Sequence, residues 1–226
     1  MRPVLVLRPE PGNTATCRAA HALGLDALAA PLFAYAAAEW QIDATTRWDG
    51  VLVGSAAVFA HGGRGLDGLR AIPAHVVGPA TARAARDAGF TVATTGSGGL
   101  QMVVAALPPG HYLRLAGAAH VPLQPPPGVT IHDVVVYAAQ AQPLAPDMAA
   151  LLQQGPALVL LHSAEAARHW CGQCDRHGLA RNRIALACLA PRIAAAAGAG
   201  WQAIAIAENP DDQALLSLAR QMCQTL

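Results

Sequence analysis

The chain repeats one pattern, in which a short apolar run ends at a small or hydroxyl-bearing residue and opens into an alanine-rich helical segment. The sequence LVGSAA at residues 52–57 resembles LLHSAE at residues 160–165, and VVGPATA at residues 76–82 resembles CLAPRIA at residues 188–194. Self-similarity over such a distance indicates duplicated structural units. The pattern therefore predicts two similar folding units instead of one continuous sheet.

Short apolar runs alternate with longer helical segments along the whole sequence. Residues 158–161, 184–188 and 203–207 are three such runs, and each precedes a helical segment. Strands that alternate with helices form parallel sheets that are covered on both faces. We therefore predict an α/β fold made of two similar parallel-sheet α/β domains.

A second repeat predicts the order of these domains along the chain. The sequence LVLR at residues 5–8 resembles YLRL at residues 112–115, but the first segment finds its remaining partners only after residue 138. Ligands of open α/β sheets bind beyond the carboxyl ends of the strands, so we expect a substrate cleft between the two domains. The predicted divisions are domain one at residues 1–34 and 138–226, inserted domain two at residues 38–134, and a two-stranded hinge at residues 33–37 and 134–138.

The basic residues exclude several kinds of chemistry. The chain has no lysine, and all fifteen of its basic residues are arginine. Schiff-base catalysis and the Walker-type phosphate loop both need a lysine amine. The net charge of +1 and the aromatic content of 4% disfavour nucleic acid as a partner. An anionic ligand must then be held by arginine, by hydroxyl groups or by backbone N–H groups.

The apolar segments do not predict a membrane protein. The most apolar stretch, residues 184–207, is interrupted by Pro191 and Gly198, whereas a membrane span needs roughly 20 uninterrupted apolar residues. The apolar run near the N-terminus is too short for a signal peptide. We expect a cytoplasmic protein that does not bind the membrane. We also expect its five cysteines to be reduced thiols.

One cysteine pair has a spacing typical of a redox or metal site. Cys171 and Cys174 are flanked by His169 and His177. A redox pair belongs at the junction of a strand and a helix, but this pair lies about two turns beyond Ser163. A zinc site usually draws its ligand pairs from separate segments. We predict no metal, and a redox- or zinc-dependent regulator is kept as an alternative.

Several residues are candidates for binding a carboxylate. A helix that begins directly after a strand attracts anions through its unpaired N–H groups and its dipole, and proline suits the first helical position. Ser55 and Ser163 occupy equivalent turns as N-caps or ligand contacts. Arg8 and Arg114 follow equivalent strands and could each clamp a carboxylate. The proline-containing helix start that is expected to attract an anion contains Gly78, Pro79, Ala80 and Thr81.

Taken in order, the motifs resemble the uroporphyrinogen-III synthase family over nearly the whole chain. No single motif is diagnostic, but their order, spacing and duplication are specific. They are Arg8-Pro9, Gly54-Ser55, VGPATA at residues 77–82, LRLAG at residues 113–117, Val136-Tyr137, LHS at residues 161–163, and the proline-led terminal helix from Asn209 to Cys223.

The resemblance implies an enzyme that closes hydroxymethylbilane, a linear tetrapyrrole with eight carboxylates, into uroporphyrinogen III. Water is lost, ring D is inverted through a spiro intermediate, and no cofactor takes part. Tyr137 matches the family's tyrosine and is the candidate proton donor, and Gly117 belongs to a matched substrate-binding motif. We expect a monomer, and the pathway allows a transient contact with the upstream enzyme that produces hydroxymethylbilane.

Two segments depart from the family pattern. The second turn, which is often rich in hydroxyl residues in the family, reads Ala190-Pro191-Arg192-Ile193, where Pro191 and Arg192 are the candidate contacts. Arg192 could replace the missing hydroxyl groups. The helix that usually follows the strand at Arg114 is expected to be shortened, because Pro122 and the prolines at 125–127 interrupt it. The lost hydroxyl groups favour one alternative, a non-catalytic two-domain module that binds a tetrapyrrole or another anion.

Overall fold

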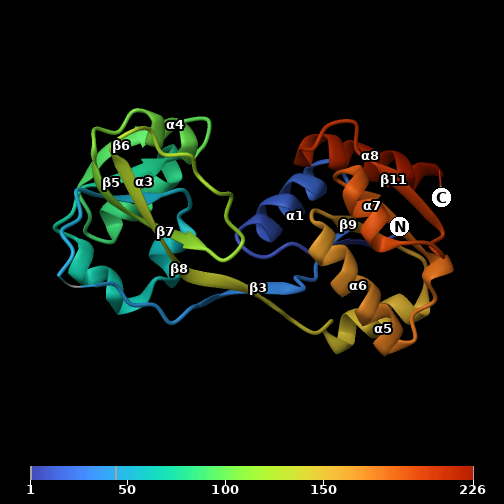
Figure 1. The fold of residues 1–226 in the computed structure, drawn as a ribbon. Coiled ribbons are helices and arrows are strands. Elements are labelled where there is room, and N and C mark those ends of the chain that lie inside the picture. Colours follow the sequence, from blue (N-terminus) through green and yellow to red (C-terminus); the bar gives the residue numbers. More distant parts are fainter. Residues whose placement is uncertain (1, 44, 226) are drawn as a thin grey trace. The chain divides into compact units, whose positions relative to one another are not determined.

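The computed structural model describes residues 2–43 and 45–225, so the predicted domain limits at residues 1 and 226 lie outside the described residues. The chain divides into two compact units (Figure 1). Unit 1 contains the segments up to Ala34 and from Gln140 onward, and unit 2 contains Tyr35–Ala139. The chain therefore passes from one unit to the other twice, next to or within the predicted hinge segments.

Unit 1 is built on a five-stranded sheet with the order β11-β10-β9-β1-β2, in which every strand pair is parallel. Val4 of β1 lies opposite Ala27 of β2 and Leu158 of β9. The three central strands are completely buried, as expected for apolar runs in a parallel sheet with both faces covered. The strands are β1 (Val4–Val6), β2 (Ala27–Ala29), β9 (Ala157–Leu161), β10 (Ile184–Cys188) and β11 (Ala203–Ile206).

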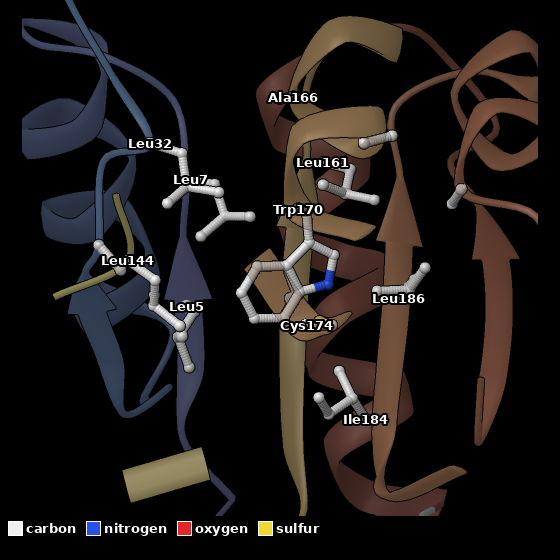
Figure 2. Packing of buried hydrophobic residues seen from close by; sticks show 14 of the residues in the cluster. Leu5, Leu7, Leu32, Leu144, Leu161, Ala166, Trp170, Cys174, Ile184 and Leu186 are labelled. Atoms are coloured by element: carbon white, nitrogen blue, oxygen red, sulfur yellow. The ribbon is translucent and has the colours of Figure 1, made fainter. Parts of the chain in front are cut away.

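Helices cover both faces of this sheet. On one face, α5, α6 and α7 enclose a core centred on Trp170, which is fully buried against side chains such as Leu161 and Leu186 (Figure 2). On the other face, α1 and α8 pack against Val4, Val6 and their neighbours. The helical segments are α1 (Gly12–Ala22), α5 (Pro146–Gln154), α6 (Ala164–His177), the 3-10 turn η2 (Arg181–Arg183), α7 (Pro191–Ala197) and α8 (Asp212–Thr225).

Most of a six-stranded sheet with the order β3-β8-β7-β4-β5-β6 lies in unit 2, and the ends of β3 and β8 extend into unit 1. Its strands from β8 to β6 are parallel. Strand β3 lies beside β8, and the bonds from Ala38 N to Val136 O and from Gln142 N to Leu32 O show that the two run antiparallel. The strands are β3 (Phe33–Ala37), β4 (Gly50–Val53), β5 (Ala74–Val77), β6 (Val92–Gly96), β7 (Gly110–Gly117) and β8 (Val129–Ala141).

The two faces of this second sheet are covered differently. Helices α2 and α3 and the 3-10 segment η1 cover one face, where Phe90, Leu113 and Val136 are buried. The other face carries α4 and the irregular segment at residues 118–128, from which Leu123 reaches a smaller core around Tyr112. The helical segments are α2 (Ala57–His61), η1 (Gly63–Leu69), α3 (Gly78–Asp87) and α4 (Leu100–Ala105).

The predicted α/β fold with two similar parallel sheets is confirmed. Strand β2 and segment η1 were not anticipated, because a strand of three residues and a glycine-rich turn have too little periodicity to read from sequence. Among the described helices, none is long and apolar enough to cross a membrane.

Candidate functional site

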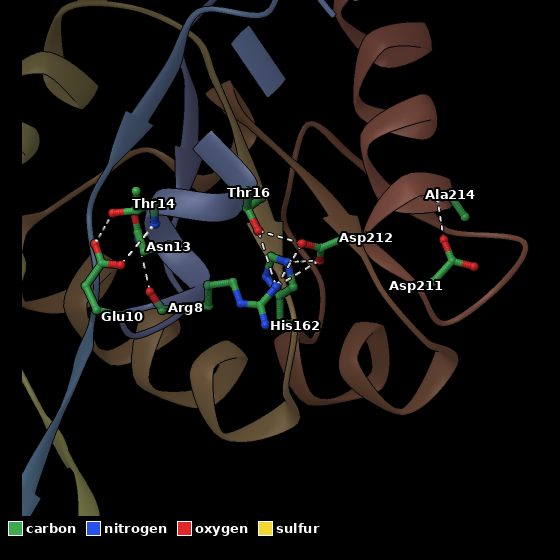
Figure 3. A network of polar contacts seen from close by, with 9 residues as sticks. All are labelled: Arg8, Glu10, Asn13, Thr14, Thr16, His162, Asp211, Asp212 and Ala214. Atoms are coloured by element: carbon green, nitrogen blue, oxygen red, sulfur yellow. Dashed lines mark hydrogen bonds and ion pairs between the residues drawn. The ribbon is translucent and has the colours of Figure 1, made fainter. Parts of the chain in front are cut away.

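Three polar side chains, Arg8, Thr16 and His162, surround Asp212 in unit 1 (Figure 3). Arg8 Nη1 donates to both carboxylate oxygens of Asp212, at 3.0 and 2.9 Å, and to Thr16 Oγ1 at 3.2 Å. Thr16 Oγ1 donates to Asp212 Oδ2 at 2.6 Å, and His162 Nε2 lies 3.0 Å from Asp212 Oδ1. Three side chains from three separate segments therefore share one carboxylate.

The topology of the sheet brings these groups together. Arg8 follows β1 and His162 follows β9, and these strands are parallel neighbours, so both residues lie at the carboxyl edge of the sheet. Asp212 begins α8, which packs on the same sheet. This edge is where ligands of open α/β sheets bind. The network thus occupies a typical site position.

Two residues of the first turn of α1 set the position of Arg8. Asn13 is buried, and its Nδ2 donates to Val6 O at 2.7 Å and to Arg8 O at 3.0 Å, which fixes the backbone at the end of β1. Gly12 leaves room for the guanidinium, because a Cβ at this position would lie 2.4 Å from Arg8 Nε. The sequence therefore provides both an anchor and an open space for this side chain.

The contacts of the network shift the pKa values of both Asp212 and His162. Burial would raise the pKa of Asp212, but the Thr16 hydroxyl, Arg8 and His162 outweigh it and lower that pKa. Burial and the Arg8 charge lower the pKa of His162, against the opposing influence of Asp212. His162 is thus neutral at neutral pH and donates its Nε2 proton to the carboxylate. Its Nδ1 is buried and unpartnered among the described residues.

In unit 2, Tyr137 of β8 belongs to a group of three rings. Its ring contacts Tyr35 edge to face at a centroid distance of 5.2 Å and His61 at 6.0 Å. Tyr35 and His61 also contact each other, at 6.0 Å. Gly117, at the end of β7, must lack a side chain, because a Cβ there would lie 2.6 Å from Tyr137 Cζ. The predicted residues Tyr137 and Gly117 are thus in contact, whereas His61 was not anticipated.

The predicted anion-binding turn at residues 78–81 begins α3. Gly78 has φ of +77°, Pro79 lies in the first turn, and the N-cap, Val77, makes no side-chain capping bond. The first turn contains no acidic residue. Ala80 is exposed, whereas Thr81 is buried. A helix start without a cap or a carboxylate leaves N–H groups available for an anion.

The two serine turns differ. Ser163 is the N-cap of α6, as predicted, and its Oγ accepts from Ala166 N at 3.0 Å. Ser55 lies one residue before the N-cap of α2, which is Ala56, so the prediction that Ser55 is itself the N-cap is wrong. Its Oγ still accepts from Ala57 N, at 3.2 Å. The short helix α2 explains the shift, since it begins one residue later relative to its strand.

Arg114 lies inside β7 and not beyond its end, and it is 5% exposed. Its Nη2 donates to Val121 O at 2.9 Å, and its Nη1 lies 3.5 Å from Asp133 Oδ2. The segment at residues 118–128 contains no helix, so the helix that was expected to be shortened is absent. Four prolines in this segment account for its irregular path.

The remaining candidates are dispersed. Pro191 and Arg192 are exposed in the first turn of the short helix α7. Cys171 and Cys174 both lie within α6, and burial raises the pKa of the Cys174 thiol to about 12. A thiol of this kind is not a thiolate at neutral pH, which disfavours the redox alternative. Among the described residues, no group of three or more potential ligands could hold a metal.

Sequence reasoning missed Asp212, Thr16 and His162 as site residues. His162 lies between an apolar strand and the capping Ser163, and this position, directly after a strand, is at the carboxyl edge of a parallel sheet, where ligands bind. Asp212 reads as an ordinary acidic residue in the first turn of a helix. Its partner Arg8 lies 204 residues away, so the pairing follows only from the strand order.

Comparisons with known proteins agree with this architecture. The family model described as Uroporphyrinogen-III synthase HemD matches residues 15–217. A structure of uroporphyrinogen-III synthetase from Helicobacter pylori 26695 aligns with a TM-score of 0.62 and 17% identity, covering 98% of this chain and 100% of that one, which indicates a shared fold. A structure of uroporphyrinogen III synthase from Thermus thermophilus aligns at 15% identity with a TM-score of 0.42, covering 100% of this chain and 99% of that one. No curated protein matches significantly. Because the family model spans most of the sequence, the chain belongs to the uroporphyrinogen-III synthase family.

Proposed function

We propose that this chain converts hydroxymethylbilane into uroporphyrinogen III, losing water and inverting ring D, as a cyclising lyase. The observation that carries the proposal is the family match over residues 15–217. The enzyme's main task is to hold a flexible chain in the conformation in which ring D is attacked at the substituted carbon. Membership of the family makes a tetrapyrrole polycarboxylate the substrate class.

The chemistry requires one proton donor at the start. A donor protonates the terminal hydroxymethyl oxygen, the C–O bond breaks with its electron pair on oxygen, and loss of water leaves the cationic, N-protonated form of an azafulvene. Ring closure through the spiro intermediate later releases one proton, which restores the donor. We propose Tyr137 as this donor, supported by its half-buried position beside Tyr35 and His61.

Carboxylate binding is assigned to residues in both units. In unit 2 the proposal uses the uncapped start of α3 (residues 78–81) with Ser55 and Gly117, and in unit 1 it uses Arg8. Ser163 is already engaged as a cap, so its proposed contact is secondary to its structural role. Arg114 is proposed mainly as a support for residues 118–128, because its guanidinium is buried. Pro191 and the exposed Arg192 remain proposed contacts.

The proposal describes a monomer in the cytoplasm that needs no cofactor and contacts the upstream hydroxymethylbilane-producing enzyme only transiently. Analytical ultracentrifugation of the purified chain, alone and with that enzyme, tests the oligomeric state and the contact. A stable dimer, or a complex that persists through gel filtration, would contradict this part without affecting the activity.

The activity is tested by feeding purified protein freshly generated hydroxymethylbilane and measuring the isomer ratio of the oxidised uroporphyrin. We expect the type III isomer to dominate without added cofactor, whereas a control without enzyme gives type I. A folded sample that leaves the type I product unchanged would refute the proposed function.

The role of Tyr137 is tested by Tyr137→Phe, with Tyr35→Phe as the matched control. A missing general acid typically costs about 100-fold or more in kcat, so we expect a loss of this size for Tyr137→Phe and a much smaller one for Tyr35→Phe. Thermal unfolding controls for stability. Equal rates for the wild type and Tyr137→Phe would remove this tyrosine from the proton transfer.

A further inference from the structure

Arg8 uses one of its three nitrogen atoms and leaves the other two available. All of its hydrogen bonds to described residues come from Nη1, which binds Asp212 and Thr16. Within the described ranges, Nε and Nη2 donate to nothing, yet neither is a fully buried unpaired atom. These two nitrogens form the edge with which a guanidinium binds a carboxylate through two parallel hydrogen bonds.

The used nitrogen is held by a carboxylate that is itself immobilised. Asp212 accepts hydrogen bonds from Thr16 and His162 as well as from Arg8, and Thr16 is fully buried. The His162 side chain is only 10% exposed, so the third partner of Asp212 is also largely enclosed by the protein. An arginine tied at one end to such an anchor loses little further freedom when its other edge binds a ligand.

The free edge is kept open by the residue beneath it. A Cβ on Gly12 would lie 2.4 Å from Nε, 2.7 Å from Cζ and 2.8 Å from Nη2 of Arg8. Gly12 has a negative φ, so its backbone does not itself demand glycine. The three atoms nearest to such a Cβ all belong to the Arg8 guanidinium, so an alanine at position 12 would displace the Nε–Nη2 side of that group.

Glu10, the acidic residue nearest to Arg8 in the sequence, does not occupy this edge. Glu10 binds Thr14, accepting from its N at 3.1 Å and from its Oγ1 at 2.8 Å (Figure 3). Glu10 therefore serves the start of α1, and Arg8 faces no second acidic partner among the described residues. A guanidinium that is one-third exposed, anchored on one side and open on the other, is suited to a carboxylate ligand.

We propose that Asp212 and Thr16, supported by His162, are positioning residues that aim the Nε–Nη2 edge of Arg8 at one carboxylate of the substrate, and that Gly12 keeps this edge open. The inference rests on the proposed function, since it takes the tetrapyrrole polycarboxylate as the ligand. It assigns to this network a role in binding the substrate and none in the chemical step.

The sharpest test is Gly12→Ala, because it adds one methyl group and changes no charge. We expect the KM for hydroxymethylbilane to rise about tenfold, the loss of one charge-assisted hydrogen bond, with kcat nearly unchanged. The control is Gly172→Ala, since a Cβ on Gly172 of α6 would have open space. Equal KM values for the two variants would overturn the role of Gly12.

A double-mutant cycle separates positioning from a general structural effect. In an Arg8→Ala background, Gly12→Ala should leave KM unchanged, because its target is already gone. An additional tenfold rise in that background would overturn the proposal. A direct titration of uroporphyrin III, followed by fluorescence, gives the same comparison as dissociation constants. This readout remains available if the wild type makes no type III isomer, so failure of the proposed function is distinguishable from failure of the inference.

Asp212→Asn tests the anchor through the sign of its effect. Removing a negative charge would by itself tighten the binding of an anion, whereas loosening Arg8 weakens it. We expect KM to rise several-fold. This corresponds to about half of the binding free energy that is lost when one charge-assisted hydrogen bond between Arg8 and the substrate is removed. Asp211→Asn is the control, because it removes the same charge while an asparagine can still cap Ala214 N. A lower KM for Asp212→Asn would overturn the positioning role.

Discussion

Strand β1 of unit 1 and strand β7 of unit 2 are similar in sequence, but their arginines lie in opposite surroundings. In unit 1, Arg8 follows β1 and the chain continues into helix α1, whose first turn leaves the guanidinium one-third exposed. In unit 2, Arg114 lies within β7, and the chain continues as the irregular segment at residues 118–128. Nη2 of Arg114 donates a hydrogen bond to Val121 O in that segment, and the Arg114 side chain is only 6% exposed.

The difference shows that the connection after the strand decides what the arginine does. Both side chains have an aspartate partner, at 2.9 Å for Arg8 and 3.5 Å for Arg114. A helix that begins with glycine leaves one edge of the guanidinium open. In unit 2 a proline-rich segment covers the guanidinium of Arg114 instead, so this arginine is a structural support. Arg8 is thus suited to a ligand and Arg114 to stability.

The largest effect that this comparison predicts is on the stability of unit 2. In Asp133→Asn the buried Arg114 loses its counter-charge, and an uncompensated buried charge costs roughly 3–5 kcal/mol. Because Asp133 is 41% exposed, we expect about 2 kcal/mol. In unit 1, Asp212→Asn should cost under about 1 kcal/mol, since Arg8 is more exposed. Hydrogen exchange resolved by segment measures each unit separately.

The same pair of variants gives the control on function. Asp133→Asn should leave the KM for hydroxymethylbilane close to that of the wild type, whereas Asp212→Asn should raise it. If Asp133→Asn raises KM as much as Asp212→Asn does, Arg114 binds substrate as Arg8 does, and the contrast between the units disappears.

The repeat made the fold predictable, but not this contrast. Apolar runs and helix starts revealed the parallel sheets, because each strand–turn–helix unit is a local pattern. The network at Asp212 depends on β1 and β9 being neighbours, and strand order is not local information. For Arg114, the sequence reasoning did not use the alternation of side chains between the two faces of a strand. Arg114 shares its face of β7 with Tyr112, and residues 118–128 cover that face.

A second contrast lies in the starts of helices α6 and α3. Ser163 caps α6 and is only a secondary substrate contact, so Ser163→Ala should lower the unfolding free energy of unit 1 by about 1 kcal/mol and raise KM less than Thr81→Ala does. The start of α3 has no side-chain cap, so Thr81→Ala should act on binding and raise KM by about fivefold. Urea unfolding and steady-state kinetics measure the two effects. Affinity that is undiminished in Thr81→Ala would count against an anion site at α3.

The smallest expected effect is on the pH dependence of stability in unit 1. Burial and Arg8 lower the pKa of His162 below its ordinary value of 6.5. As the pH falls below roughly 6.5, His162 binds a proton in the unfolded chain but not yet in the folded chain, so the unfolding free energy of the wild type declines. In His162→Gln this decline is absent, while glutamine can still donate to Asp212.

We therefore expect the unfolding free energy of the wild type to fall more steeply than that of His162→Gln between about pH 7 and pH 5, by less than one proton equivalent. Asp212 does not interfere, because its lowered pKa places its own contribution in more acidic solution. His75→Gln is the matched variant in unit 2, where burial also lowers the pKa of the histidine. Its effect should appear in the hydrogen exchange of unit 2 alone.

Parallel curves for the wild type and His162→Gln would mean that the folded protein accepts the proton on His162. Asp212 would then face two cations in mildly acidic solution, and it could no longer serve chiefly as the anchor of Arg8.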